Sequence, residues 1–143
     1  MRAKILLADS AEVREGLLFL LGGGWSVVGP QPQAFAIAGL IEVAWDETNE
    51  KHPLAFTIED EDGTPLLVPT PQGDQPIRVE SALDVGRPPG APRGTSFNVP
   101  LALPLPPIPW KPGRRYVVRM TIDDAEMDRL TFSVRPTPPS DVG

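Results

Sequence analysis

The sequence contains no cysteine and only one histidine, His52. Without cysteine the chain has no disulfide framework, no thiolate nucleophile and no Cys-ligated metal site. A lone histidine allows no His–His metal pair, and any Ser–His triad would have to use it. The G-x-S-x-G elbow that presents a nucleophilic serine is also missing. We therefore expect a non-enzymatic protein with no catalytic residue, no metal and no cofactor.

Long apolar runs and an excess of basic residues are absent as well. The run at 17–21, LLFLL, is far shorter than the roughly 20 residues that cross a bilayer. Acidic residues interrupt the N-terminal segment before a signal-peptide core can form. The net charge is −6, which argues against binding to nucleic acid or to anionic membranes. We therefore expect protein partners, either in the cytoplasm or in a particle that is assembled there.

Helical spacing is not sustained anywhere, whereas alternation with a period of two runs along most of the chain. Apolar residues alternate in six segments, near 35–45, 54–58, 77–83, 97–103, 116–122 and 130–134. Two N-terminal runs, KILLA and LLFLL, complete about eight strands. Asp62–Gly63 and the segment DDAEMD lie between apolar runs at hairpin length. The pattern predicts an all-β fold of antiparallel strands, a sandwich or a barrel.

The segment WKPGRRY favours a sandwich over a barrel. A loop ending in Pro-Gly, followed by Tyr116 at the start of a strand, resembles the tyrosine corner of immunoglobulin-like sandwiches. In that corner the phenol hydroxyl bonds to backbone upstream in the chain. The preceding segment LPLPPIP suits a connection that crosses between sheets, because proline cannot donate inside a central sheet. We therefore predict an immunoglobulin-like Greek-key β-sandwich.

Three glycines, Gly22, Gly23 and Gly24, precede Trp25. Neither a Walker loop nor a dinucleotide fingerprint fits, because no Lys-Ser or Lys-Thr follows and Val27 stands where the third glycine belongs. The residues that follow are β-branched rather than helix-forming. The interpretation is structural: a tight bend with positive φ, after which Trp25 returns to the core.

Charge is unevenly distributed. The charged residues within 42–62 are all acidic except Lys51, whereas no acidic residue lies between Asp84 and Asp123. The acidic clusters EDEDG and DDAEMD lack the spacing of an EF-hand and are interpreted as solvated turns. The basic segment indicates either a surface that steers self-association or docking on an acidic partner, or an ordinary scatter of charges that the fold places on different faces. Its candidate contact residues are Arg87, Arg93, Trp110, Arg114 and Arg115.

Several motifs together, ILLADSAEV, LLGGGW, VAWDETNEKH, EDEDG and VGRPPG, resemble an uncharacterised family of small all-β proteins of actinobacteria and their phages. The resemblance covers nearly the whole chain and implies a small β domain without established activity. We expect one domain over residues 1–135 and a Pro-rich tail over 136–143. The expected function is an accessory or decoration protein of an actinobacteriophage virion. The alternative is a cytoplasmic bacterial β-sandwich that binds a protein or a small ligand.

One face of the strand near 34–44 is too apolar for water. It carries Ala36, Ala38, Leu40 and Ala44, and LLFLL is apolar on both faces. An antiparallel sheet normally keeps one face polar, and contiguous exposed apolar patches mark interaction sites. We therefore expect the chain to work within an oligomer or larger assembly, held through a sheet face and its Pro-rich tail.

Overall fold

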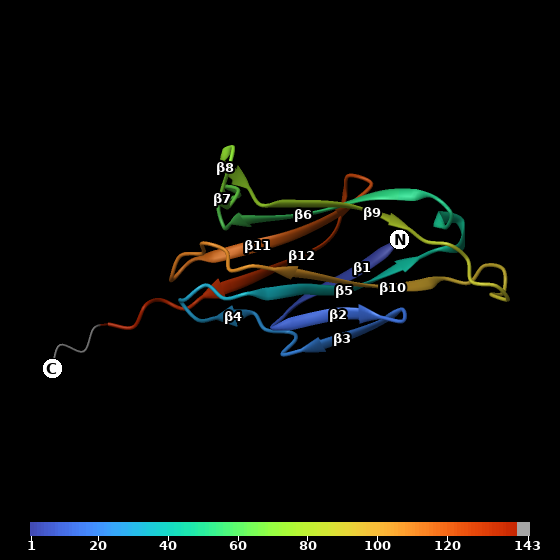
Figure 1. The fold of residues 1–143 in the computed structure, drawn as a ribbon, viewed down its shortest axis with the longest axis horizontal. Helices are drawn as coiled ribbons and strands as arrows, with labels where there is room; N and C mark the ends of the chain where they lie inside the picture. Colours follow the sequence, from blue (N-terminus) through green and yellow to red (C-terminus); the bar gives the residue numbers. More distant parts are fainter. Residues whose placement is uncertain (140–143) are drawn as a thin grey trace.

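The computed structural model describes residues 1–139 and is built of β-strands (Figure 1). This confirms the all-β class that the period-two alternation predicted. A single turn of 3-10 helix, η1 (Trp45–Glu47), interrupts the strands. The strands are β1 (Arg2–Ala8), β2 (Ser10–Arg14), β3 (Leu17–Leu21), β4 (Val27–Val28), β5 (Phe35–Val43), β6 (Lys51–Asp60), β7 (Leu67–Thr70), β8 (Gly73–Pro76), β9 (Arg78–Asp84), β10 (Phe97–Leu105), β11 (Arg115–Ile122) and β12 (Ala125–Val134).

Two sheets enclose the core. The three-stranded sheet has the order β1-β5-β10, and the five-stranded sheet has the order β4-β12-β11-β6-β9. All neighbours are antiparallel except β4 and β12, which pair in parallel. The chain crosses from β5 to β6, returns from β9 to β10, and crosses again from β10 to β11. The strands that the sequence predicted from alternation are the long members of these sheets.

The core lies between the two sheets and uses one face of each strand. Ile37, Ile41 and Val43 of β5 are fully buried and face Val118 and Met120 across the interior. At the end of the sandwich where β5 begins with Phe35, the core ends in an aromatic cluster centred on Phe132. The ring centroids of Trp25, Trp110 and Tyr116 lie 5.8, 5.8 and 5.6 Å from that of Phe132.

The crossing segment before β11 has the contact expected of a tyrosine corner. The hydroxyl of Tyr116 accepts a hydrogen bond of 2.7 Å from the backbone N–H of Lys111. Tyr116 is buried, so this bond satisfies its hydroxyl and fixes the Pro-rich connection against the start of β11.

The immunoglobulin-like Greek key is a finer interpretation and stays a prediction. Its support is the strand order. Taken as strands A, B, C, E, F and G, the strands β1, β5, β6, β10, β11 and β12 give A-B-E against G-F-C, the immunoglobulin arrangement. The remaining long strand, β9, pairs with β6 rather than with β10, so it belongs to the five-stranded sheet.

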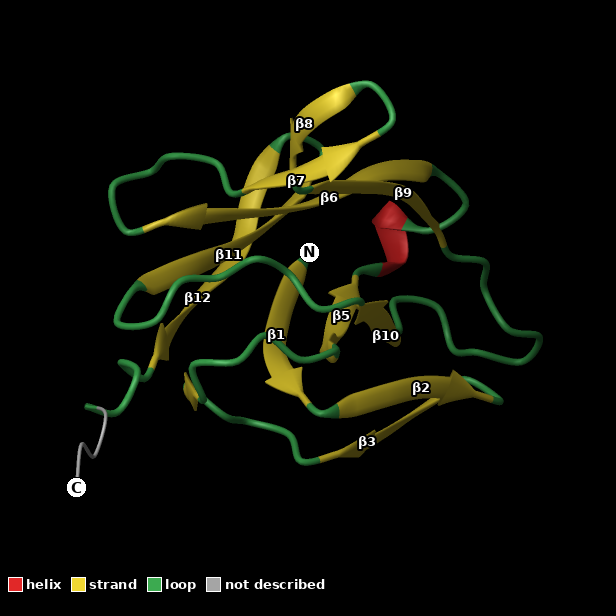
Figure 2. Cartoon of the chain, turned by 60° about the vertical axis from the view of Figure 1, so that its left-hand side comes forward, coloured by secondary structure: helices red, strands yellow, loops and turns green. Residues whose placement is uncertain are grey.

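The β2–β3 hairpin forms a third layer below the three-stranded sheet (Figure 2). It packs across β5 and β10 on the face opposite the core. The apolar face expected to meet a partner is therefore partly covered from within the chain, since Ala36 and Ala38 are fully buried. Leu40, nearer the other end of β5, stays exposed.

The glycine segment makes the bend that ends the hairpin. Gly22 and Gly24 have positive φ, at 61° and 92°, a conformation that costs glycine little. A Cβ on Gly22 would lie 2.2 Å from a carboxylate oxygen of Asp9, so the Asp9 side chain would have to move to admit any other residue. The bend delivers Trp25 edge-on against Phe35 and Phe132.

After β12, residues 136–139 run exposed and outside any strand. The rest of the Pro-rich tail expected from the sequence, 140–143, lies outside the described residues.

Candidate interaction surface

The β2–β3 hairpin carries five of the eight exposed large hydrophobic residues of the described chain: Val13, Leu17, Phe19, Leu20 and Leu21. Its loop consists of Glu15 and Gly16, both with positive φ (51° and 73°), as in the two-residue turns that match the twist of a hairpin. This turn sets the register, with Arg14 opposite Leu17 and Ser10 opposite Leu21. Because side chains alternate along a strand, Leu17, Phe19 and Leu21 share one face of the hairpin with Ser10, Glu12 and Arg14.

That shared face points to solvent. The exposed fractions are 61% for Leu17, 46% for Phe19 and 73% for Leu21, and Val13 and Leu20 on the other face are also exposed. Large side chains of this kind are normally scattered on a monomer surface. Here they are contiguous along one strand, which is the pattern of an interaction site.

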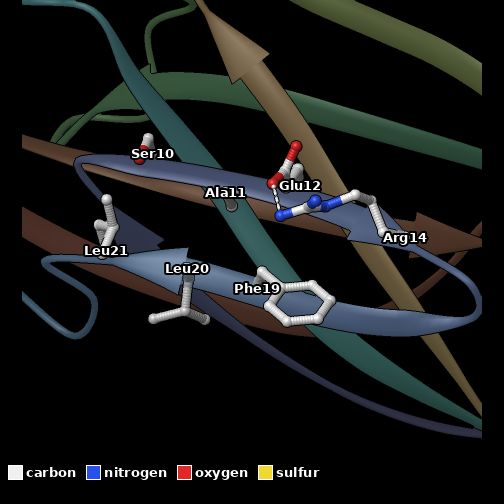
Figure 3. A pocket seen from close by; sticks show the side chains of 7 residues that line it. All are labelled: Ser10, Ala11, Glu12, Arg14, Phe19, Leu20 and Leu21. Carbon is white, nitrogen blue, oxygen red and sulfur yellow. Dashed lines mark ion pairs between the residues drawn. The ribbon is translucent and has the colours of Figure 1, made fainter.

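A shallow hollow of about 410 Å³ lies along the hairpin and is lined by residues of both of its faces, including Phe19, Leu20 and Leu21 (Figure 3). Glu12 and Arg14 form an ion pair of 2.8 Å at its rim, and the guanidinium carbon of Arg14 lies 5.1 Å from the centroid of Phe19. The hollow thus combines an aromatic ring and leucine side chains with one fixed pair of opposite charges.

The basic contact residues predicted from the sequence are not brought together. Arg115 begins β11 beside the end of β6, where Tyr116 pairs with Asp60. Arg87 follows β9, whose last residue, Asp84, pairs with Lys51 at the start of β6. Arg87 and Arg93 therefore lie at one end of the five-stranded sheet, and Arg114 and Arg115 lie at the other. The basic residues that the sequence suggested as one contact surface are therefore divided between the two ends of this sheet.

Two of these residues also have intramolecular roles. Trp110 is buried in the aromatic cluster and is not a surface contact, because its ring packs against Phe35 and Phe132. Arg87 stacks over Trp45, with its guanidinium carbon 4.0 Å from the ring centroid. Its side chain also donates to the hydroxyl of Thr48 and to the carbonyl of Trp45, at 2.6 and 2.8 Å. Arg93, Arg114 and Arg115 are exposed.

The acidic clusters act within turns. A carboxylate oxygen of Asp60 accepts hydrogen bonds from the backbone N–H groups of Asp62 and Thr64, at 2.9 and 3.0 Å. Asp123 and Asp124 form the β11–β12 turn with positive φ. Among residues 1–139, no three His, Asp or Glu side chains gather as metal ligands would. None of the helical structure described there has the length and apolarity to cross a membrane.

Sequence reasoning identified LLFLL as unusually apolar but did not place it in a hairpin or name its residues as contacts. The signal that it missed is the pair Glu15–Gly16 between two short runs, SAEVR and LLFLL. A two-residue loop containing glycine between such runs indicates a hairpin.

The fold and this surface define the class of protein: a small all-β domain with an apolar hairpin laid on one of its sheets. The chain belongs to a family of unknown function, DUF6941, whose model matches residues 4–135. The match covers all of the strands described above except the first two residues of β1. No curated protein and no solved structure is similar to the chain in the comparisons.

Proposed function

We propose that the protein is a non-enzymatic interaction module that joins a larger protein assembly through its β2–β3 hairpin. The observation that carries the proposal is the contiguous exposure of Leu17, Phe19 and Leu21 on one strand. Keeping such side chains in water is unfavourable by roughly 25 cal/mol per Å² of apolar surface, so their burial against a partner is a driving force for association.

More specifically, we propose that the protein is an accessory or decoration protein of an actinobacteriophage particle. This form rests on the resemblance of motifs such as VAWDETNEKH and VGRPPG to proteins of actinobacteria and their phages. The architecture is compatible with it, because a rigid sandwich leaves its apolar hairpin at the periphery for docking (Figure 1).

The test is the composition of particles from a phage that encodes the chain. Particles purified on a density gradient are analysed by quantitative mass spectrometry, with a host cytoplasmic protein as the contamination control. We expect the protein at a fixed copy number relative to the major capsid protein. Its absence from washed particles would overturn the virion assignment.

A second function, a cytoplasmic protein that binds a small ligand, is favoured by the hollow over the hairpin. Its volume of about 410 Å³ falls within the range of ligand sites, roughly 300–1,000 Å³, and its rim holds the Glu12–Arg14 pair. Thermal-shift screening of amphipathic ligands distinguishes this function. A stabilising ligand whose effect disappears in Arg14→Ala supports it, whereas particle incorporation without any ligand response supports the assembly role.

A further inference from the structure

The edges of the sheets differ in how they are protected against pairing with another strand. Natural edge strands carry charges or prolines, or are very short, because an open edge is a template for association. Among the described residues, the protecting groups are Arg2 and Lys4 in β1, Glu12 and Arg14 in β2, Pro69 in β7, Asp74 and Pro76 in β8, Arg78, Glu80 and Asp84 in β9, and Pro100 and Pro104 in β10. The edge strand β4 has only two residues. The exception is β3, which has five residues and neither a charge nor a proline.

The free edge of β3 carries backbone groups ready to pair. In a hairpin with a two-residue loop, the pair flanking the loop is hydrogen-bonded, and bonded and non-bonded pairs then alternate. Leu17 and Phe19 therefore direct their backbone N–H and C=O toward β2. Leu18 and Leu20 direct theirs outward. Among residues 1–139, β2 is the strand that pairs with β3. Figures 1 and 2 both place β3 at the periphery.

The sequence of β3 reads the same in both directions: Leu-Leu-Phe-Leu-Leu. In an antiparallel pair of two such strands centred on Phe19, phenylalanine lies opposite phenylalanine and every leucine lies opposite a leucine. The outward backbone groups of Leu18 then meet those of Leu20 in the other copy. Each of these two symmetric pairs forms two hydrogen bonds, so the seam has about four.

The seam also brings apolar side chains together: Leu17, Phe19 and Leu21 of one copy would lie beside Leu21, Phe19 and Leu17 of the other on one face of the joined sheet. β3 itself carries no charge, and the charged side chains beside it, Glu12 and Arg14 of β2, pair with each other.

We propose that β3 pairs antiparallel with β3 of a second copy, forming a continuous four-stranded sheet in the order β2-β3-β3-β2 about a two-fold axis at Phe19. This deepens the proposed function, on which it rests, by naming the partner of the hairpin. A closed two-fold contact uses the same edge of both copies and does not propagate into a fibre.

Sedimentation velocity over a concentration series tests the association. We expect the wild-type protein to shift from monomer to dimer with a dissociation constant in the micromolar range. Phe19→Lys places two positive charges opposite each other in the seam and should raise that constant at least tenfold. Leu67→Lys is the matched control: Leu67 is 47% exposed, close to the 46% of Phe19, but lies in the β7–β8 hairpin. It should dimerise like the wild type.

Cysteine cross-linking tests the register, and the absence of native cysteine makes the result unambiguous. Phe19→Cys should form a disulfide-linked dimer rapidly on oxidation, because the two Cα atoms of a non-hydrogen-bonded pair lie about 4.5 Å apart. Leu17→Cys alone should cross-link slowly. A mixture of Leu17→Cys and Leu21→Cys should give the mixed dimer, because these positions oppose each other.

A wild-type protein that stays monomeric up to about millimolar concentration would overturn the pairing, as would equal cross-linking of all three cysteine variants. Circular dichroism of each variant verifies that the fold is retained. A monomer that is nevertheless incorporated into phage particles would refute self-pairing and leave the proposed function standing, so the two failures are distinguishable.

Discussion

Nδ1 of His52 lies 2.7 Å from a carboxylate oxygen of Asp123, across the end of the five-stranded sheet. The other ring nitrogen, Nε2, lies 2.7 Å from the carbonyl oxygen of Glu47. A carboxylate and a carbonyl can only accept, so both ring nitrogens donate when the imidazole is protonated. The carbonyl of Glu47 and then the carboxylate of Asp123 raise the pKa of this buried histidine above its ordinary value of 6.5. His52 thus joins η1 to the β11–β12 turn through both ring nitrogens, and protonation of the ring favours both contacts.

The first prediction is a loss of stability at alkaline pH. Because the pKa of His52 is higher in the folded than in the unfolded chain, its contribution is complete below pH 6.5 and is lost as pH rises through the folded value. The measurement is the urea midpoint between about pH 6 and pH 9. Glu47, which neighbours His52, does not titrate in this pH range. Its ordinary pKa is 4.5, and the hydrogen bond from the backbone N–H of Ala44 lowers that pKa further.

Asp123→Asn serves as the comparison variant. Asparagine tolerates the positive φ of 53° at this turn and still offers an oxygen to the ring, but it removes the charge. Near pH 6 it should cost about 1 kcal/mol or less, since the Asp123 side chain is half exposed. It should also flatten the pH dependence. An unchanged slope would show that Asp123 does not contribute to the histidine's pKa.

The second prediction concerns the tyrosine corner. Tyr116→Phe removes the acceptor of the Lys111 N–H and leaves the ring in place. The expected loss is about 0.5–1.5 kcal/mol in the free energy of unfolding, and more if the N–H is left without water. Chemical denaturation measures it, with an unchanged m value indicating that the fold is retained. A midpoint equal to that of the wild type would argue against a structural role for the hydroxyl.

The third prediction separates a core role of Trp110 from a surface role. Trp110→Ala should destabilise the protein by about 3–5 kcal/mol, because it opens a cavity beside Phe35 and Phe132. Leu67→Ala, at an exposed position, should change stability by no more than about 0.5 kcal/mol. Thermal unfolding of the two variants gives the comparison. Similar melting temperatures for the two variants would contradict a core role of Trp110 and favour a surface role.

The fourth prediction tests the intramolecular role of Arg87. Arg87→Lys keeps the charge but cannot reproduce the stacked, forked contact with Trp45 and Thr48. We expect a loss of about 0.5–1 kcal/mol, typical of an exposed cation–π contact. Arg93→Lys, in the same loop, is the control and should be neutral. Equal effects of both substitutions on stability would exclude a special role for the stack.

The sequence predicted the strands that bury one face, because burial imposes the alternation that is visible in segments such as 116–122. It did not predict β2, whose residues alternate weakly since the strand is largely exposed and Ala11 is its one half-buried residue. Nor did it place Trp110 in the core: a tryptophan among prolines gives no local sign of burial, which depends on Phe35 and Phe132 arriving from distant strands. The stack of Arg87 on Trp45 joins residues 42 positions apart and leaves no periodic trace.

The order of the strands in the three-stranded sheet also governs when the fold can form during synthesis. Its central strand, β5, ends at Val43, but its partner β10 begins only at Phe97, and β4 pairs with β12 at the far end of the chain. Nearly the whole domain must therefore leave the ribosome before the sandwich closes, and pairing over such separations is slow. The β2–β3 hairpin is local and can form first, yet the sheet on which it rests does not exist until β10 is made. The side of the hairpin that faces this sheet, which carries Leu18 and Leu20, thus stays uncovered until then, so growth temperature and chaperone supply should govern the soluble yield of this protein.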